Sequence, residues 1–302
     1  MQLNANRMPR PQADDSPPIP VQQPGFRAAL RRTVLLSATA LAPRLTADQL
    51  ARRYLTSDQS VIDTLSGLSR RFEVLDLGED TALLRSRFAI SRPGGPRVLI
   101  APGHDGHIRQ FTRVVRALQK RGAAVDILIF PGHGHAARRI CSLRHMVDSI
   151  CRAARSEGPY DGIVAHCVAA NAMFHALERG VACQKLALIS VPLDLPGLIR
   201  LGGRQYGLSG RCLDRFVARV DALGAPCAID KPWRPVAQDR KEDLLIVQAL
   251  NDYAAPVEKV RPLAETWPRA RLDVFENGGH NGILNVTSAI DRIAGFMTTD
   301  PR

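Results

Sequence analysis

The sequence has few aromatic residues and no long apolar run. Phe, Trp and Tyr make up only 5% of the 302 residues, so a core must be built from Leu, Val, Ile and Ala. No stretch of about 18 apolar residues is present, so no membrane-spanning helix is expected. The basic residues near the N-terminus are not followed by an apolar segment of signal-peptide length, which favours a cytoplasmic protein.

The six cysteines follow neither a pairing pattern nor a metal-binding pattern. They stand at positions 141, 151, 167, 183, 212 and 227, without any Cys-x-x-Cys. This spacing excludes a zinc ribbon and predicts free thiols in a reducing compartment. Four of them lie in segments without a chemical signal and are interpreted as structural: Cys141, Cys151, Cys183 and Cys212.

The positive charge of the chain is spread out. The formal net charge is +12, yet no run of five or six like charges occurs. Aromatic residues are not interleaved with basic ones as stacking platforms would require, so nucleic-acid binding is not expected. Residues 1–33 contribute only +3 and the rest of the chain contributes +9. An acidic macromolecular partner is therefore compatible with the sequence.

The chain divides into three predicted parts. Residues 1–25 are polar and Pro-rich, which predicts a disordered arm. Residues 26–71 are predicted to be a helical N-terminal extension, because Leu residues and valine recur there at helical spacing. Residues 72–302 carry the pattern of one larger domain.

Short apolar strands alternate with helices in this larger domain. Two predicted strands around Gly78 form a hairpin, and strands at 97–101, 124–130, 160–166 and 185–190 alternate with three helices. Such an order predicts an α/β fold with a mostly parallel sheet and helices on both faces. The alternation stops at about 192–240, which predicts a helical lid, and resumes with the strand at 243–249.

Cys167 lies at a chemically favourable point of this pattern. It follows the third alternating strand and precedes a helix, and catalytic groups of such sheets lie beyond the carboxyl ends of the strands. A helix N-terminus stabilises a thiolate, and the N–H of Val168 is expected to face an oxyanion next to the sulfur. The alternative interpretation is a small buried apolar residue, which is common for cysteine.

The segment Ala165-His166-Cys167-Val168-Ala169 resembles the G-x-S-x-G turn of the α/β-hydrolases, with cysteine at the serine position and alanine at both glycine positions. The resemblance covers residues 72–298 and is greatest to bacterial single-domain members with a helical lid. It implies the order nucleophile, acid, histidine, with Cys167 as nucleophile, Asp252 as acid and His280 as general base. Asp194, after the strand at 185–190, is an alternative acid.

The same resemblance implies an oxyanion hole and a substrate pocket. The loop Pro102-Gly103-His104 resembles the family's H-G-x-G loop, so the backbone N–H of His104 is expected to join that of Val168 as a donor. His133 lies in a turn that resembles another family motif and is interpreted as structural. Three further side chains are expected to line the substrate pocket: His166, His107 and Trp233.

The predicted function is that of a cysteine-dependent acyl hydrolase or acyltransferase, thioesterase- or esterase-like, without cofactor or metal. The expected substrate is a small-molecule or carrier-bound acyl group, with an acidic acyl carrier protein as a possible partner. Two alternatives stay open. One is a non-catalytic binding protein on a degenerate hydrolase fold. The other is a zinc-dependent hydrolase that uses four histidines on neighbouring loops: His104, His107, His133 and His135.

Overall fold

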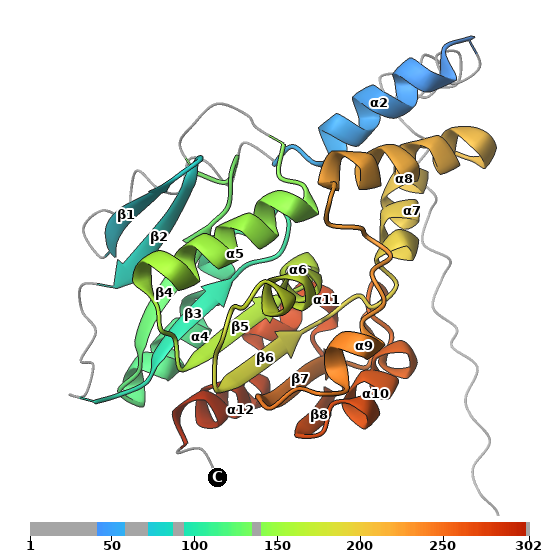
Figure 1. Ribbon diagram of the computed structural model, residues 1–302. Helices are drawn as coiled ribbons and strands as arrows, with labels where there is room; N and C mark the ends of the chain where they lie inside the picture. Colours follow the sequence, from blue (N-terminus) through green and yellow to red (C-terminus); the bar gives the residue numbers. More distant parts are fainter. Residues whose placement is uncertain (1–40, 58–71, 87–93, 135–139, 300–302) are drawn as a thin grey trace, which may run out of the picture.

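The computed structural model describes residues 41–57, 72–86, 94–134 and 140–299 (Figure 1). The predicted arm, residues 1–25, and much of the predicted extension lie outside these ranges. The described part is built around one eight-stranded sheet with the order β1-β2-β4-β3-β5-β6-β7-β8. In the region described, no helix is long and apolar enough to cross a membrane.

The first two strands are an antiparallel hairpin at one edge of the sheet. Strands β1 (Phe72–Gly78) and β2 (Thr81–Ser86) pair with each other, and β2 pairs antiparallel with β4 (Ala124–Ile129). The turn between them places Glu79 and Asp80 in the left-handed region, with φ of 53° and 58°. The hairpin expected around Gly78 is therefore present.

The other five strands run parallel to β4, as the alternating pattern predicted. They are β3 (Arg97–Ala101), β5 (Gly162–His166), β6 (Lys185–Ile189), β7 (Asp243–Ala249) and β8 (Ala270–Phe275). Residues at equivalent positions of neighbouring strands are paired, so the carboxyl ends of these strands lie side by side along one end of the sheet. Groups that follow different strands can therefore meet at that end.

Helices cover both faces of the sheet and produce two apolar cores. Alternate residues of each strand enter different cores, as Leu99 and Ile100 of β3 do. One core contains α4 (Thr112–Lys120) and α12 (Thr287–Thr298). The other contains α5 (Leu143–Glu157), α6 (Val168–Glu178) and α10 (Val257–Thr266). The predicted fold class, an α/β sheet with helices on both faces, is confirmed.

The interval between β6 and β7 is helical. It contains α7 (Leu195–Gln205), α8 (Gly210–Gly224) and the short α9 (Arg234–Ala237). The described part of the N-terminal extension contains α2 (Pro43–Tyr54), which lies along α8 (Figure 1). Arg219 of α8 forms an ion pair with Asp48 of α2, and Ala47 and Ala51 of α2 are buried in the same core as the apolar face of α8.

Candidate functional site

The turn between β5 and α6 is tight and places Cys167 in an unusual backbone conformation. Its φ is 53° and its ψ is −128°, a combination that L-residues rarely adopt. The backbone N–H of Cys167 donates to the carbonyl of Ile189 on the neighbouring strand at 3.0 Å, which holds the turn against β6. A strained residue that the surrounding structure holds in place is typical of a functional site.

Gly103 makes this turn possible from the opposite side. A Cβ atom added to Gly103 would lie 2.9 Å from the Cβ of Cys167 and 3.1 Å from Nδ1 of His166. Real Cβ atoms do not approach so closely, so only glycine allows the loop after β3 to touch the turn. From the sequence, Gly103 was recognisable only as part of a loop. No local pattern could reveal the contact, because the two segments are about 60 residues apart.

His280 and Asp252 meet beside Cys167. Nδ1 of His280 lies 3.0 Å from both carboxylate oxygens of Asp252, and Cys167 is near enough to raise the pKa of His280. Because Asp252 occupies Nδ1, Nε2 is the ring nitrogen that remains for the sulfur. Three side chains from three separate loops therefore come together, in the order that the resemblance implied.

The charge state of His280 depends on these two partners. Burial lowers its pKa, but the hydrogen bonds to Asp252 and Cys167 outweigh burial and raise the pKa to about 10. The Asp252 carboxylate has the complementary shift, since the hydrogen bond and charge of His280 lower its pKa against the raising effect of burial. The pair therefore favours an imidazolium next to the sulfur.

Asp252 is held by its surroundings as well as by His280. One carboxylate oxygen accepts hydrogen bonds from the backbone N–H groups of Ala254 and Ala255 at 2.9 and 3.0 Å. The other accepts from Nε2 of the buried Gln248 at 3.1 Å. Gln248 was not identified from sequence. These contacts orient the carboxylate before any substrate arrives.

The neighbouring Asn251 joins the acid loop to the histidine loop. Its Oδ1 accepts a hydrogen bond from the backbone N–H of Gly279 at 2.9 Å, one residue before His280. The short helix α11 (Gly279–Gly282) carries His280 and is therefore tied to the loop that carries its partner. The relative position of acid and base thus depends on main-chain as well as side-chain contacts.

The alternative acid, Asp194, is occupied elsewhere. It is the N-cap of α7, where its Oδ1 accepts from the backbone N–H of Gly197 at 2.9 Å. Its Oδ2 forms an ion pair with Lys259 at 2.6 Å, and the Lys259 hydrogen bond lowers the pKa of Asp194. His280 is hydrogen-bonded to Asp252 instead.

Two backbone N–H groups in the segments next to Cys167 have no partner in the described structure. The N–H of Val168 is the first of α6, and the N–H of His104 lies in the loop that Gly103 brings to Cys167. Neither donates a hydrogen bond to a described residue. N–H groups without an internal acceptor are available to an anionic oxygen.

His133 supports the loop of His104. Its Nε2 accepts from the backbone N–H of Asp105 at 3.1 Å, and its Nδ1 donates to the carbonyl of Pro131 at 3.1 Å. Burial lowers the pKa of His133 to about 4, which agrees with a neutral ring that both donates and accepts. The structural role interpreted from sequence agrees with this position.

This use of His133 also bears on the zinc alternative. A metal would need the lone pair on Nε2 of His133. That lone pair already accepts a hydrogen bond from the Asp105 N–H. Across residues 41–57, 72–86, 94–134 and 140–299, no group of three or more His, Cys, Asp or Glu side chains is arranged to hold a metal ion. His135 lies outside the described residues.

The three residues expected to line the substrate pocket have other surroundings. His166 is buried between Phe111 and His280, and its Nε2 donates to the backbone carbonyl of His280 at 3.1 Å. His107 is the N-cap of the short helix η2 (Ile108–Phe111) and accepts from the backbone N–H of Arg109. Trp233 borders a small void of about 10 Å³ over α6, among residues that do not include Cys167.

One residue that sequence reasoning missed comes from the N-terminal helix. The ring of Tyr54, at the end of α2, stacks on His104 with centroids 6.0 Å apart and an angle of 11° between the planes. It packs edge-on against Phe216 of α8 and lies against the backbone of Gly202 in α7. Burial and the charge of Cys167 both raise the pKa of Tyr54, so the hydroxyl lies within electrostatic reach of the sulfur.

Comparisons with known proteins identify the fold. No family model and no curated protein matches the chain. Solved structures do match, including an esterase of Butyrivibrio proteoclasticus with bound ferulic acid, at a TM-score of 0.56 and 16% identity over 74% of this chain and 97% of that one. An esterase of Pyrococcus furiosus matches at a TM-score of 0.55 and 18% identity, over 78% and 93% of the two chains.

An esterase of Exiguobacterium antarcticum also matches, at a TM-score of 0.56 and 13% identity over 75% of this chain and 99% of that one. Together with the sheet order and the helices on both faces, these matches show that the chain has the α/β-hydrolase fold. At such low identity the comparison concerns the fold, so the chemistry has to be argued from the site itself.

Proposed function

We propose that the protein is an acyl hydrolase or acyltransferase that works through an acyl-cysteine on Cys167. The observation that carries this proposal is the hydrogen-bonded pair of His280 and Asp252 beside Cys167, which itself raises the pKa of His280. Thiolate, imidazolium and carboxylate in this order are the groups that activated cysteine nucleophiles use. The esterase neighbours support an acyl substrate, since esters and thioesters undergo the same substitution at carbonyl carbon.

In the first step, the Cys167 sulfur attacks the carbonyl carbon and the carbonyl π electrons move to the oxygen. The N–H groups of Val168 and His104 stabilise that oxyanion. His280 then gives its proton to the leaving oxygen or sulfur, the carbon–heteroatom bond breaks, and an acyl-cysteine remains. In the second step, neutral His280 takes a proton from water or another acceptor as it attacks, and the thiolate leaves.

Cysteine at this position favours thioesters and activated esters. Exchange between a thiolate and a thioester forms one carbon–sulfur bond and breaks another of similar strength, so the first step is close to balanced in energy. An amide would have to expel a much poorer leaving group. The raised pKa of His280 agrees with this chemistry, because an imidazolium is ready to protonate the leaving group at neutral pH.

The acyl group would lie under the cover that α2, α7 and α8 form. Tyr54 reaches from α2 to His104 and touches both other helices, so these three elements share one wall next to the oxyanion loop. We therefore assign the lid function to α7 and α8 together with α2. The N-terminal extension would then take part in acyl selection, a role that the sequence did not reveal.

The direct test is intact-protein mass spectrometry after incubation with short thioesters and p-nitrophenyl esters. The wild type is expected to gain one acyl mass, and Cys167→Ala none. Cys212→Ala is the matched control, because Cys212 is as buried as Cys167, both being 8% exposed. Acylation that persists in Cys167→Ala would refute the proposal. No acylation of the wild type by any probe would favour a non-catalytic binding protein.

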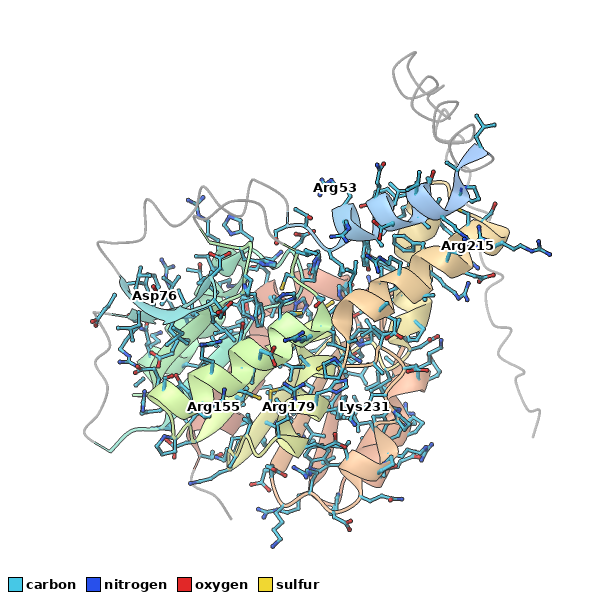
Figure 2. All side chains as sticks on the ribbon, turned by 45° about the horizontal axis from the view of Figure 1, so that its top comes forward. Arg53, Asp76, Arg155, Arg179, Arg215 and Lys231 are labelled. Atoms are coloured by element: carbon cyan, nitrogen blue, oxygen red, sulfur yellow. The ribbon has the colours of Figure 1, made fainter. Side chains whose placement is uncertain are left out.

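The basic surface suggests that the acyl donor is attached to an acidic carrier protein. Arg53 on α2 and Arg215 on α8 are both exposed and stand at the end of the molecule where these helices cover the site (Figure 2). Arg53→Glu with Arg215→Glu should weaken binding of an acylated carrier protein. Arg155→Glu, on α5 and away from α2, is the control. Binding that is unchanged by the double substitution or by salt would contradict this partner.

A further inference from the structure

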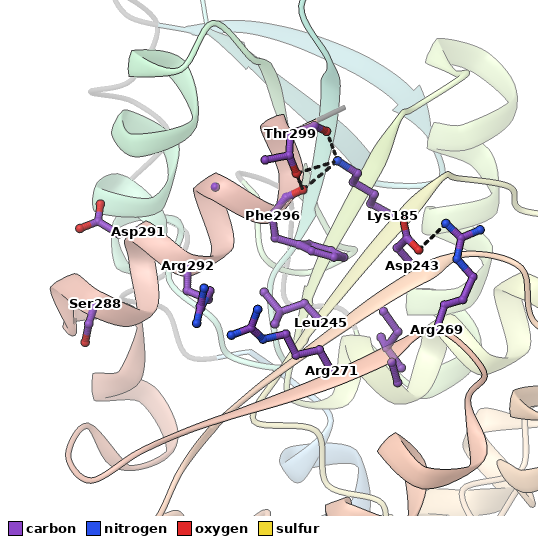
Figure 3. Close-up of a pocket in the computed structure, with 13 residues that line it drawn as sticks. Lys185, Asp243, Leu245, Arg269, Arg271, Ser288, Asp291, Arg292, Phe296 and Thr299 are labelled. Atoms are coloured by element: carbon purple, nitrogen blue, oxygen red, sulfur yellow. Dashed lines mark hydrogen bonds and ion pairs between the residues drawn. The ribbon is translucent and has the colours of Figure 1, made fainter. Parts of the chain in front are cut away.

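A concave site lies at the amino ends of the parallel strands, opposite the carboxyl ends where Cys167 lies. A cleft of about 980 Å³ opens at the amino ends of β6, β7 and β8, where these strands begin at Lys185, Asp243 and Ala270 (Figure 3). One face of α12, along its whole length, forms the other wall. Because the sheet is parallel in this region, the cleft is separated from Cys167 by the length of the strands.

Two of the basic residues in the cleft bind other residues of the protein. The ammonium of the buried Lys185 donates to the carbonyl of Phe296 at 2.9 Å and to Thr299, and so holds the end of α12. Arg269 forms an ion pair with Asp243 at 2.6 Å. These contacts shape the wall of the cleft.

Arg271 and Arg292 differ, because they share one carboxylate. The Nε of Arg271 lies 2.7 Å from one oxygen of Asp273, and the Nε of Arg292 lies 2.7 Å from the other. Asp273 is largely buried between them. One negative charge for two guanidinium groups leaves a net positive charge, and Asp273 fixes the direction of both side chains.

The terminal nitrogens of these two guanidinium groups have no partner among the residues that the structure describes. Both groups lie side by side at the cleft, and Asp291 points away from them (Figure 3). A guanidinium presents its N–H groups as a fork that matches two oxygens of a phosphate. Two such forks, paired with Asp273 and open at their ends, match a dianionic group.

The floor beneath these forks is apolar. The partly exposed Phe296 lines the cleft with its ring facing into it, and the fully buried Leu245 lies behind (Figure 3). A small inorganic anion would leave this floor in contact with water. A ligand with an apolar or aromatic part next to its phosphate would cover it.

We propose that this cleft binds a phosphate monoester that carries an aromatic or apolar group. Arg271 and Arg292 hold the phosphate oxygens, and the apolar group lies on Phe296. The volume is at the upper end of the range for small-molecule sites, about 300–1,000 Å³. The site does not depend on the acyl chemistry, since none of its residues belongs to the group of Cys167, His280 and Asp252.

The test is isothermal titration of the full-length protein with phenyl phosphate and, separately, with inorganic phosphate. Phenyl phosphate should bind more tightly than inorganic phosphate. Arg271→Gln and Arg292→Gln should each raise the Kd for phenyl phosphate by about tenfold or more, as expected for loss of a charge-assisted pair. Phe296→Ala should reduce the affinity for phenyl phosphate to that for inorganic phosphate. The affinity for inorganic phosphate should stay unchanged.

Arg144→Gln is the matched control. Arg144 also forms one Nε contact with an aspartate, Asp148, and is 55% exposed against 56% for Arg271, but it lies on α5 outside the cleft. Its binding should equal that of the wild type. Cys167→Ala should bind normally as well, which separates this proposal from the catalytic one.

Thermal unfolding without ligand identifies any variant that has lost its fold. Arg271→Lys, which keeps the charge and loses the fork, then serves as the second variant and should bind between wild type and Arg271→Gln. The proposal is overturned if neither probe binds the wild type, or if folded Arg271 and Arg292 variants bind as the wild type does. It is overturned too if Phe296→Ala leaves the preference for phenyl phosphate intact.

Discussion

The contact between Gly103 and the Cys167 turn leads to a sharp prediction for Gly103→Ala. The new methyl carbon would lie 2.9 Å from the Cβ of Cys167 and 3.1 Å from Nδ1 of His166, whereas ordinary contact begins near 3.4 Å. Backbone strain is not involved, because Gly103 does not have a positive φ. The only ways to accommodate the methyl group are to move the loop after β3 or the turn that carries the sulfur.

Either movement has a measurable cost. Overpacking in a close-packed region costs about 1–3 kcal/mol of unfolding free energy. A displacement of the sulfur or of the His104 N–H by about 1 Å reduces kcat/KM by about 100-fold. Urea unfolding and steady-state kinetics on p-nitrophenyl acetate measure the two effects separately.

Gly282→Ala is the matched control for this substitution. Gly282 lies in α11, two residues after His280, and an added Cβ there has no heavy atom within 4 Å. That variant should keep its activity and unfold at the same denaturant concentration as the wild type or slightly higher. If Gly103→Ala retained both wild-type turnover and wild-type stability, the close approach of the two loops would be refuted.

Three further predictions concern the groups around the sulfur. Asp252→Asn should lower kcat by about 10⁴-fold while the fold persists, because the amide would orient His280 in the wrong tautomer; a small effect in stopped-flow acylation would contradict this. Tyr54→Ala should shift the preference among p-nitrophenyl esters toward longer acyl chains, and Tyr54→Phe should not. The unfolding free energy that His280 contributes, relative to His280→Gln, should be fully present below pH 6.5 and lost as the pH rises toward 10, because its folded pKa is raised to about 10. A difference between the two proteins that stays constant across this range in urea titrations would disprove the pairing.

Much of the fold was predictable because its signals are local. Buried parallel strands are continuous apolar runs, and β7 begins and ends where the pattern indicated. The order of Cys167, Asp252 and His280 along the chain was implied by the family resemblance, and each of the three follows a strand. Parallel strands bring their carboxyl ends together, so residues after such strands were expected to meet.

The residues predicted to line the pocket have surroundings that a local pattern does not contain. His166, next to Cys167 in the sequence, is buried against Phe111 and His280, which belong to other segments of the chain. Trp233 was chosen for its apolar surface and borders a small void over α6.

Cys167 shows where sequence and tertiary structure each contribute. The sequence by itself determined that a cysteine stands between a buried strand and a helix, since apolar runs and small residues are properties of the local chain. Only the tertiary structure decided what surrounds the sulfur. Gly103 reaches the Cys167 turn, and Tyr54 stacks on His104, through contacts between segments far apart in the chain, and the pKa of His280 depends on burial. Such contacts arise from packing, which no single stretch of sequence contains.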